Sequence, residues 1–184
     1  MRNLSLVIFG LALFLPIPTM SGGEFKLESG FSLLFTGKNL DGWREKGSKT
    51  TLEGKTEAFK GRFKVANGVL VYDPKVGGDR YIETTKDFGK DVTFKFDFKA
   101  GPKCNNDILF RGTKFDIVPD KGETKEVKEG VWYTFELIAT GNKVEHKING
   151  KTVRGPRDTK AKSGPLVLRA EFGAIEIKNI RVKE

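Results

Sequence analysis

Apolar residues recur at every second position over much of this chain. The clearest run covers residues 92–99, in which valine and phenylalanine alternate with threonine, lysine and aspartate. Residues 133–139 and 166–171 repeat the alternation. A period of two is typical of β-strands that bury one face, and about eleven such runs follow one another at spacings of about 8–12 residues. The pattern therefore predicts an all-β protein with little helix.

Two dipeptides indicate tight turns between neighbouring strands. They are Asn67-Gly68 and Asn149-Gly150, each placed between two apolar runs. Asn-Gly favours a two-residue hairpin of type I′, because both of its residues accept a positive φ. In the last strand the apolar phase slips by one residue, which predicts a β-bulge near residues 178–179.

The predicted fold is an antiparallel β-sandwich of two sheets packed face to face. Many short strands with turn residues between them favour this architecture. The absence of helical patterns between the strands argues against βαβ units, and so against Rossmann and TIM-barrel folds. One sheet of such a sandwich can be concave, and its outward side chains then line a groove.

The first 21 residues have the layout of a secretory signal peptide. Arg2 carries the only charge, residues 4–15 are apolar, and prolines follow at positions 16 and 18. The apolar run is shorter than the roughly 20 residues of a membrane span. We therefore expect cleavage after Ser21 and no lasting membrane anchor, with an uncleaved anchor as the alternative. The sequence predicts export to the periplasm or the extracellular space and a single domain over residues 22–184.

The composition excludes several classes of site and partner. One histidine and one cysteine cannot form a three-histidine or four-cysteine zinc site, or an intrachain disulfide. The net charge is +9, yet basic residues alternate with acidic ones, so we expect no nucleic-acid partner. No cofactor is predicted. A calcium ion held by carbonyls and scattered carboxylates leaves no sequence pattern, so a divalent metal such as calcium stays open, as does the oligomeric state.

The single histidine and the single cysteine are both expected in the core. His146 shares the face of Val144 and Ile148, which favours a packed rather than a catalytic histidine. A reactive cysteine needs a nearby base, and the sequence shows none beside Cys104. We therefore interpret Cys104 as a small, partly buried residue that fills space.

Three strand-like segments differ from the other surface positions, which are mostly lysine, glutamate and threonine. They cover residues 105–111, 114–117 and 166–172. If the apolar residues of each segment point inward, the polar residues between them point outward. If the three strands are neighbours, they form one polar cluster of Asn105, Asp107, Arg111, Lys114, Asp116, Arg169 and Glu171.

This polar cluster has two interpretations. Paired carboxylates flanked by guanidinium groups can hold a polyhydroxylated ligand through bidentate hydrogen bonds. They can also separate two carboxyl pKa values enough for acid and base roles. The alternative is a solvated face on which the charges only satisfy one another.

Several segments together resemble the 3-keto-disaccharide hydrolase family. The segment Leu-Phe-Thr-Gly-Lys-Asn-Leu-Asp-Gly-Trp at residues 34–43 is similar to the family's opening signature. The resemblance spans residues 31–184 and implies a concanavalin-A-like sandwich of the jelly-roll type, exported from bacteria and acting on oxidised sugars. Further matches follow in the family's order at residues 63–70, 105–111, 132–133, 149–150 and 173–182.

The activity that this resemblance implies is cleavage of 3-keto-glycosides. A ketone at C3 acidifies the hydrogen on C2, so a carboxylate base can remove that proton while the C1 substituent leaves and water then adds. Asp116 or Glu171 would be the base. Arg111 or Arg169 would be the cation beside the enolate oxygen. The other residues of the cluster would bind the sugar, namely Asn105, Asp107 and Lys114.

The chain departs from the family pattern at four of these positions, the first being Asp107, which stands where the family has a glycine. Lys114 stands where the family has an acid, Asp116 where it has an amide, and Arg169 where it has a glutamine. The alternative function is therefore a secreted, non-catalytic carbohydrate-binding module of the lectin type. Such modules stack sugar rings on tryptophan or tyrosine, and this chain has two Trp and three Tyr, of which Trp43 is expected beneath a sheet.

Overall fold

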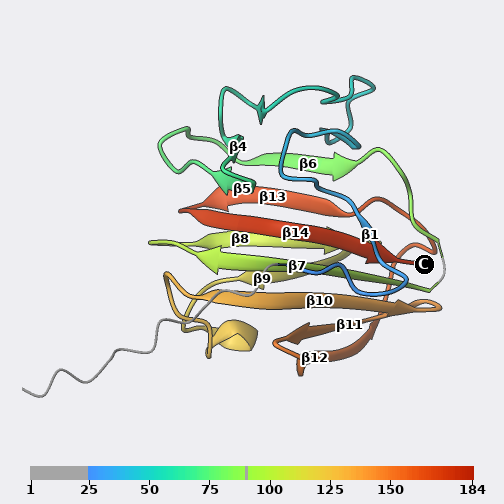
Figure 1. Cartoon of the computed structure of the whole chain (residues 1–184). Helices are drawn as coiled ribbons and strands as arrows, with labels where there is room; N and C mark the ends of the chain where they lie inside the picture. Colours follow the sequence, from blue (N-terminus) through green and yellow to red (C-terminus); the bar gives the residue numbers. More distant parts are fainter. Residues whose placement is uncertain (1–24, 90) are drawn as a thin grey trace, which may run out of the picture.

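The computed structural model describes residues 25–89 and 91–184. The predicted signal segment at residues 1–21 lies outside the described residues. In the described part, fourteen strands form two antiparallel sheets (Figure 1). The strands of both sheets run in nearly the same direction across Figure 1, as in an aligned β-sandwich. This architecture confirms the all-β fold predicted from the alternation.

The larger sheet contains nine strands. They are β1 (Ser32–Leu33), β3 (Glu57–Ala58), β4 (Phe63–Ala66), β5 (Val69–Tyr72), β7 (Val92–Ala100), β10 (Trp132–Thr140), β11 (Lys143–Ile148), β12 (Lys151–Asp158) and β14 (Ile175–Lys183). Their order is β12-β11-β10-β7-β14-β5-β4-β3, and β1 also pairs with β14.

The smaller sheet contains five strands in the order β2-β6-β13-β8-β9. They are β2 (Trp43–Glu45), β6 (Arg80–Thr84), β8 (Asn105–Phe110), β9 (Thr113–Ile117) and β13 (Val167–Phe172). A 3₁₀-helix, η1 (Gly122–Thr124), follows β9. The described residues include no helix long and apolar enough to cross a membrane. Because β13 lies between β6 and β8, segments that are far apart in the sequence meet in this sheet.

The core lies between the two sheets and is rich in phenylalanine. The Phe94 ring of β7 packs edge-on against Phe110 of β8, with 5.1 Å between ring centroids. Phe115 of β9 packs against Phe135 of β10 at 5.0 Å. Both contacts join one sheet to the other, so the inward residues of the alternating runs form one hydrophobic core. Trp43 is also buried, as expected, and its indole N–H donates to the Leu34 carbonyl.

The predicted turns and bulge are all present. Asn67 and Gly68 have φ values of 51° and 79°, and Asn149 and Gly150 have 49° and 76°, as type I′ turns require. The β14–β7 register shifts between Lys178 and Arg181, which confirms the predicted bulge. This bulge returns the apolar side chains of β14 to the core.

His146 and Cys104 both lie in the core, as the sequence predicted. The His146 ring stacks on Phe115 with 4.8 Å between centroids, and neither ring nitrogen has a hydrogen-bond partner within the described chain. Burial lowers the pKa of His146 to about 3. Burial likewise raises the pKa of the Cys104 thiol to about 11. Neither side chain is therefore suited to acid–base or nucleophilic chemistry at neutral pH.

Candidate functional site

One row of polar side chains crosses four neighbouring strands of the five-stranded sheet. The register pairs Tyr81 of β6 with Arg169 of β13, Arg169 with Asp107 of β8, and Asp107 with Asp116 of β9. Directly opposed residues on antiparallel strands point to the same side and lie about 5 Å apart. The pairing of β6, β13, β8 and β9 therefore gathers these four side chains on the outer side of the sheet.

Arg169 is the centre of this row because its guanidinium contacts three carboxylates. Its Nη1 lies 2.5 Å from Asp107 Oδ2 and 2.8 Å from Glu171 Oε2. Its Nε and Nη2 donate to the two oxygens of Asp79 at 2.9 and 2.7 Å. The bidentate bond to Arg169 is the main reason why the pKa of Asp79 lies below its usual value. The Arg169 side chain is therefore fixed, with its guanidinium also over the Tyr81 ring.

Lys114 supplies the second positive charge. Its Nζ lies 2.5 Å from Asp116 Oδ1 and 3.8 Å from Asp107 Oδ2. We call the six charged residues the acidic cluster, which consists of Asp79, Asp107, Lys114, Asp116, Arg169 and Glu171. Four carboxyl groups thus share two cations, so the cluster has an excess of acid in a chain whose net charge is +9.

Asp107 and Asp116 have opposite pKa shifts although their side chains are cross-strand neighbours. Asp107 is fully buried, and burial raises its pKa to about 6 against the hydrogen bond from Arg169. Burial also disfavours the charge on Asp116, but hydrogen bonds from Lys114 and Asp107 hold the pKa of Asp116 below its usual value. Two neighbouring carboxyls with separated pKa values can share one proton and divide acid and base roles.

The structure brings five of the seven sequence-predicted site residues into the acidic cluster. These five are Asp107, Lys114, Asp116, Arg169 and Glu171. Asn105 lies further along β8, where it pairs with Phe172 and lines a separate shallow hollow. It is therefore beside the cluster rather than in it.

Arg111 is placed away from the cluster, contrary to the alternation that led us to expect it there. It follows the last residue of β8 and has a φ of 47°, so the period of two ends before it. Its side chain is buried, and its Nη1 donates to the Gly141 carbonyl at 2.9 Å. The turn at Arg111–Gly112 redirects this side chain into the protein, and the cations of the cluster are Lys114 and Arg169.

Sequence reasoning missed Asp79 and Tyr81, which contact Arg169 from the start of β6. Tyr81 alternates with the buried Ile82 and so has the pattern of an outward-facing residue. Nothing in the local pattern shows that β6 lies beside β13, since about 85 residues separate them. Only the strand order reveals this contact.

Two hollows flank the acidic cluster. The first, of about 460 Å³, is lined by Asp79 and Tyr81, and we call it the Tyr81 hollow. The second, of about 440 Å³, is lined by Glu171 and by residues of the β5–β6 loop, and we call it the Glu171 hollow. Volumes of this size suit small-molecule sites. The acidic cluster therefore lies between two spaces that can each hold part of a ligand.

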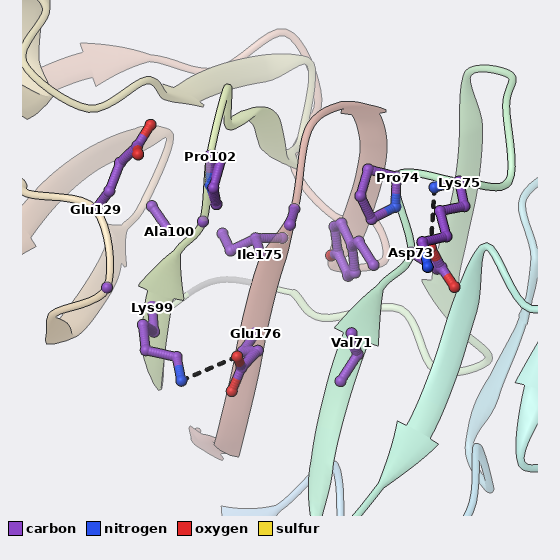
Figure 2. Close-up of a pocket in the computed structure, with 14 residues that line it drawn as sticks. Val71, Asp73, Pro74, Lys75, Lys99, Ala100, Pro102, Glu129, Ile175 and Glu176 are labelled. Carbon is purple, nitrogen blue, oxygen red and sulfur yellow. Dashed lines mark hydrogen bonds and ion pairs between the residues drawn. The ribbon is translucent and has the colours of Figure 1, made fainter.

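A larger hollow of about 640 Å³ lies elsewhere, at the ends of β5, β7 and β14 (Figure 2). Its lining is mainly apolar, and Lys99 forms an ion pair with Glu176 there at 2.9 Å. Figure 2 shows Asp73 and Glu129 on opposite sides of it. Its carboxylates are thus apart from one another, and the acidic cluster remains the better candidate for chemistry.

Metal binding was left open by the sequence. Over residues 25–89 and 91–184, no group of three or more His, Cys, Asp or Glu side chains is placed to hold a metal ion. In the acidic cluster, Arg169 and Lys114 occupy the positions between the carboxylates.

Comparison with known proteins identifies a family and a fold. A family model described as a 3-keto-alpha-glucoside-1,2-lyase-like domain matches residues 30–125 and 115–183. A proposed glycosyl hydrolase from Parabacteroides distasonis has a similar structure, with a TM-score of 0.67 and 19% identity over 84% of this chain and 93% of that chain. A second proposed glycosyl hydrolase from the same organism has a TM-score of 0.62 and 17% identity, over 84% of this chain and 98% of that chain.

A carbohydrate binding module from Bacillus subtilis has a similar fold as well. Its TM-score is 0.52 and its identity 13%, over 78% of this chain and 96% of that chain. A comparison with curated protein sequences gave no match. At these identities the structural likeness shows the sandwich fold alone, and the family match carries the assignment.

Proposed function

This chain belongs to the family of 3-keto-alpha-glucoside-1,2-lyase-like domains, and we propose that it is an exported enzyme that cleaves 3-keto-glycosides. The family supports a function related to carbohydrates. The finer proposal, cleavage by proton abstraction, elimination and hydration, rests on the acidic cluster. The single observation that carries it is the pair Asp107 and Asp116, with separated pKa values beside two fixed cations.

The reaction needs one base and one cation. The base removes the proton on C2, and the electron pair of that C–H bond forms an enolate with the C3 ketone. When the enolate collapses, a double bond forms between C1 and C2, the C1–O bond breaks, and the leaving oxygen takes up a proton. Water then adds to C1 and a proton returns to C2, so the net result is hydrolysis.

Asp116 is the residue best placed to be the base. The side chain of Asp116 is 39% exposed, whereas that of its cross-strand neighbour Asp107 is fully buried, with 0% exposed. The lowered pKa of Asp116 keeps it ionised at neutral pH. Above the pKa of Asp107, both carboxyls are charged and the pair can accept a proton from C2. Asp107 then acts as a positioning residue that raises the proton affinity of the pair.

Lys114 is the cation that we assign to the enolate oxygen. The N–H groups of Arg169 are directed to Asp79, Asp107 and Glu171. The Lys114 side chain is 47% exposed and has further N–H donors for a ligand. An ammonium held in place before the reaction stabilises a developing enolate without reorganisation. Glu171, whose side chain is 32% exposed, is the second carboxylate that a sugar hydroxyl can reach.

The test is incubation of the purified protein with a panel of 3-keto-glycosides, with and without a chelator, while released sugar is measured. We expect turnover, and a loss of about 10²–10⁴-fold in kcat for Asp116→Asn, which removes the base. The matched control is Glu176→Gln, an ion-paired carboxylate on the other sheet, which should leave turnover unchanged. If Asp116→Asn and Glu171→Gln both kept full turnover, the assignment of this site would be abandoned.

The pH profile gives a second readout. Since burial raises the pKa of Asp107 to about 6, kcat/KM should rise as the pH increases through about 6. Below that pH the pair already holds one proton and is a weak base. In Asp107→Asn the rise should move to lower pH, because the pKa of Asp116 then sets it.

The second candidate function is a carbohydrate-binding module without chemistry. One observation favours it, namely that every charged group of the acidic cluster already has an oppositely charged partner within 4 Å. Such a module would bind intact polysaccharide and release no sugar. Measurement of binding and release in the same reaction separates the two functions.

A further inference from the structure

Arg62 is a buried cation that forms no ion pair with any carboxylate of residues 25–89 and 91–184. It lies just before β4, and only 2% of its surface is exposed. Its Nη1 donates to the Asp73 carbonyl at 2.7 Å, but its Nε has no hydrogen-bond partner within the described chain. The carboxylates that influence its charge, those of Asp73 and Asp79, do so only at a distance.

Such a charge is unfavourable as it stands. Burial of a guanidinium away from water destabilises the protein unless an opposite charge compensates it. In accordance with this, burial is the main reason why the pKa of Arg62 lies below its ordinary value. A ligand that brings a negative charge to Arg62 would supply the missing compensation.

Arg62 lines the Glu171 hollow, beside the acidic cluster. Lys103 lines the same hollow and adds a second positive charge. Gly77 and Gly78 also line the hollow; a Cβ placed on Gly77 would meet nothing within 4 Å, whereas one placed on Gly78 would lie 3.2 Å from the guanidinium carbon of Arg80. The lining of the hollow thus combines two cations with one carboxylate, that of Glu171, and with two glycines that carry no side chain of their own.

Phe172 also lines the hollow and is unusually exposed. It is the last residue of β13, directly after Glu171, and 59% of its surface is accessible. Exposed aromatic rings next to polar groups are suited to stacking against the apolar face of a sugar. An exposed ring and a buried guanidinium that border one hollow would together recognise a sugar with an acidic substituent.

We propose that the Glu171 hollow is a subsite for a sugar unit that carries an oxyanion, either a carboxylate or a sulfate group. Arg62 and Lys103 bind the oxyanion, and Phe172 stacks on the ring. This proposal deepens the proposed function, since it takes the acidic cluster as the place where the neighbouring sugar unit reacts. It identifies the substrate as an acidic glycoside.

The binding experiment uses isothermal titration calorimetry on the full chain at low and high salt. The probes are methyl glucoside, methyl glucuronide and methyl glucoside 6-sulfate. We expect at least one of the two acidic probes to bind 10-fold or more tightly than the neutral probe, with a preference that weakens in high salt. The comparison of the two acidic probes distinguishes carboxylate from sulfate. Equal affinities for all three probes would overturn the proposal.

Three variants locate the binding, namely Arg62→Met, Lys103→Met and Phe172→Ala. Arg62→Met should reduce the affinity for the acidic probe at least 10-fold and leave the neutral probe unchanged, while its Tm stays the same or rises because an uncompensated charge is gone. Phe172→Ala, on the surface, should weaken the binding of all three probes. The matched control is Lys99→Met, in the separate hollow of Figure 2, which should have no effect. An acidic preference that survives Arg62→Met and Lys103→Met would contradict the proposal.

The two proposals fail separately. If the acidic probe binds as expected but no 3-keto-glycoside is turned over, the enzymatic proposal fails and the subsite stands. If turnover occurs without any acidic preference, the subsite fails and the enzyme stands. Asp116→Asn should retain the acidic preference, because Asp116 does not line the Glu171 hollow.

Discussion

The outer faces of the two sheets carry similar residue types but differ in how their charges are matched. On the nine-stranded sheet, the numbers of cations and acids in contact are more nearly equal, although Lys95 also lies 3.9 Å from Glu28 and Glu123 contacts both Arg154 and Arg157. Lys95 lies 3.3 Å from Glu136, and Lys99 lies 2.9 Å from Glu176. On the five-stranded sheet, Arg169 alone contacts three carboxylates, and one of its partners is fully buried.

This difference separates a structural surface from a candidate site. Balanced, partly exposed pairs are each worth at most about 1 kcal/mol and shift no pKa far. Burial raises the pKa of a carboxyl, and a neighbouring acid adds to the shift; the pKa of Asp107 is thereby raised to about 6. The arrangement around Asp107 lowers the stability of the protein but favours proton transfer. Functional sites commonly lose stability in exchange for activity in this way.

The largest expected effect comes from removal of the cation at the centre of the acidic cluster. Arg169→Met should lower the free energy of unfolding by about 3 kcal/mol at pH 7.5, because three carboxylates lose their common partner. The matched change on the other sheet, Lys95→Met, should cost less than about 1 kcal/mol. Urea unfolding of both variants measures the two values.

The pH dependence of stability in these two variants tests whether repulsion between carboxylates causes the loss. Protonation of the carboxylates removes their repulsion, so the deficit of Arg169→Met should shrink as the pH falls from 7.5 to 4. Equal losses in the free energy of unfolding for Arg169→Met and Lys95→Met at pH 7.5 would show that the charges on the two outer faces are equivalent.

A smaller effect of opposite sign is expected for Asp107→Asn. The folded-state pKa of Asp107 is about 6, above its ordinary value of 3.8, so its contribution to stability is complete below about pH 4 and is lost as the pH rises through 6. The amide keeps the shape of the protonated acid and can donate to Asp116. The variant should therefore be more stable than the wild type at pH 7.5, by on the order of 2 kcal/mol. Urea unfolding at pH 4 should show no such gain, and a loss of stability at pH 7.5 would refute the argument.

The smallest effect concerns His146, which titrates in the opposite direction. Burial lowers its pKa from 6.5 to about 3, so its contribution to stability is complete above about pH 6.5 and is lost as the pH falls toward 3. His146→Leu removes two unpartnered buried nitrogens and should raise the unfolding free energy by about 1 kcal/mol at pH 7.5.

His146→Leu and Asp107→Asn together separate the two titrations. Between pH 4 and 6 the titrations of Asp107 and His146 change stability in opposite directions and partly cancel in the wild type. As the pH rises from 4 to 6, the free energy of unfolding of His146→Leu should decrease, and that of Asp107→Asn should increase. Thermal unfolding at three pH values in the range checks both slopes; parallel slopes would count against both pKa shifts.

Most of the fold was predictable from local pattern. A period of two, two Asn-Gly turns and one slip of apolar phase were sufficient for the strands, two hairpins and the bulge of β14. These features depend on backbone sterics and on the burial of alternate side chains, which act over a few residues. The strands β1 and β3, with two residues each, are too short to produce such a pattern.

The candidate site was only partly predictable. Arg111 was expected beside Asp107 because alternation was extended one residue too far, past the end of β8. Asp79 and Tyr81 were not expected at all, because their contact with Arg169 depends on which strands are neighbours. A local pattern gives the side to which a residue points but not the strand beside it.

Local patterns in the sequence were sufficient for most strands and turns of this protein and for most of the charges on its outward positions. Three features follow from the tertiary structure: Asp107 is buried beside Arg169, Arg62 forms no ion pair within the part of the chain that the structure describes, and two hollows adjoin the acidic cluster. The physical reason is one of range. Strands and turns arise from interactions between residues close in the chain, whereas burial, pKa shifts and charge compensation depend on every group that folding brings into contact.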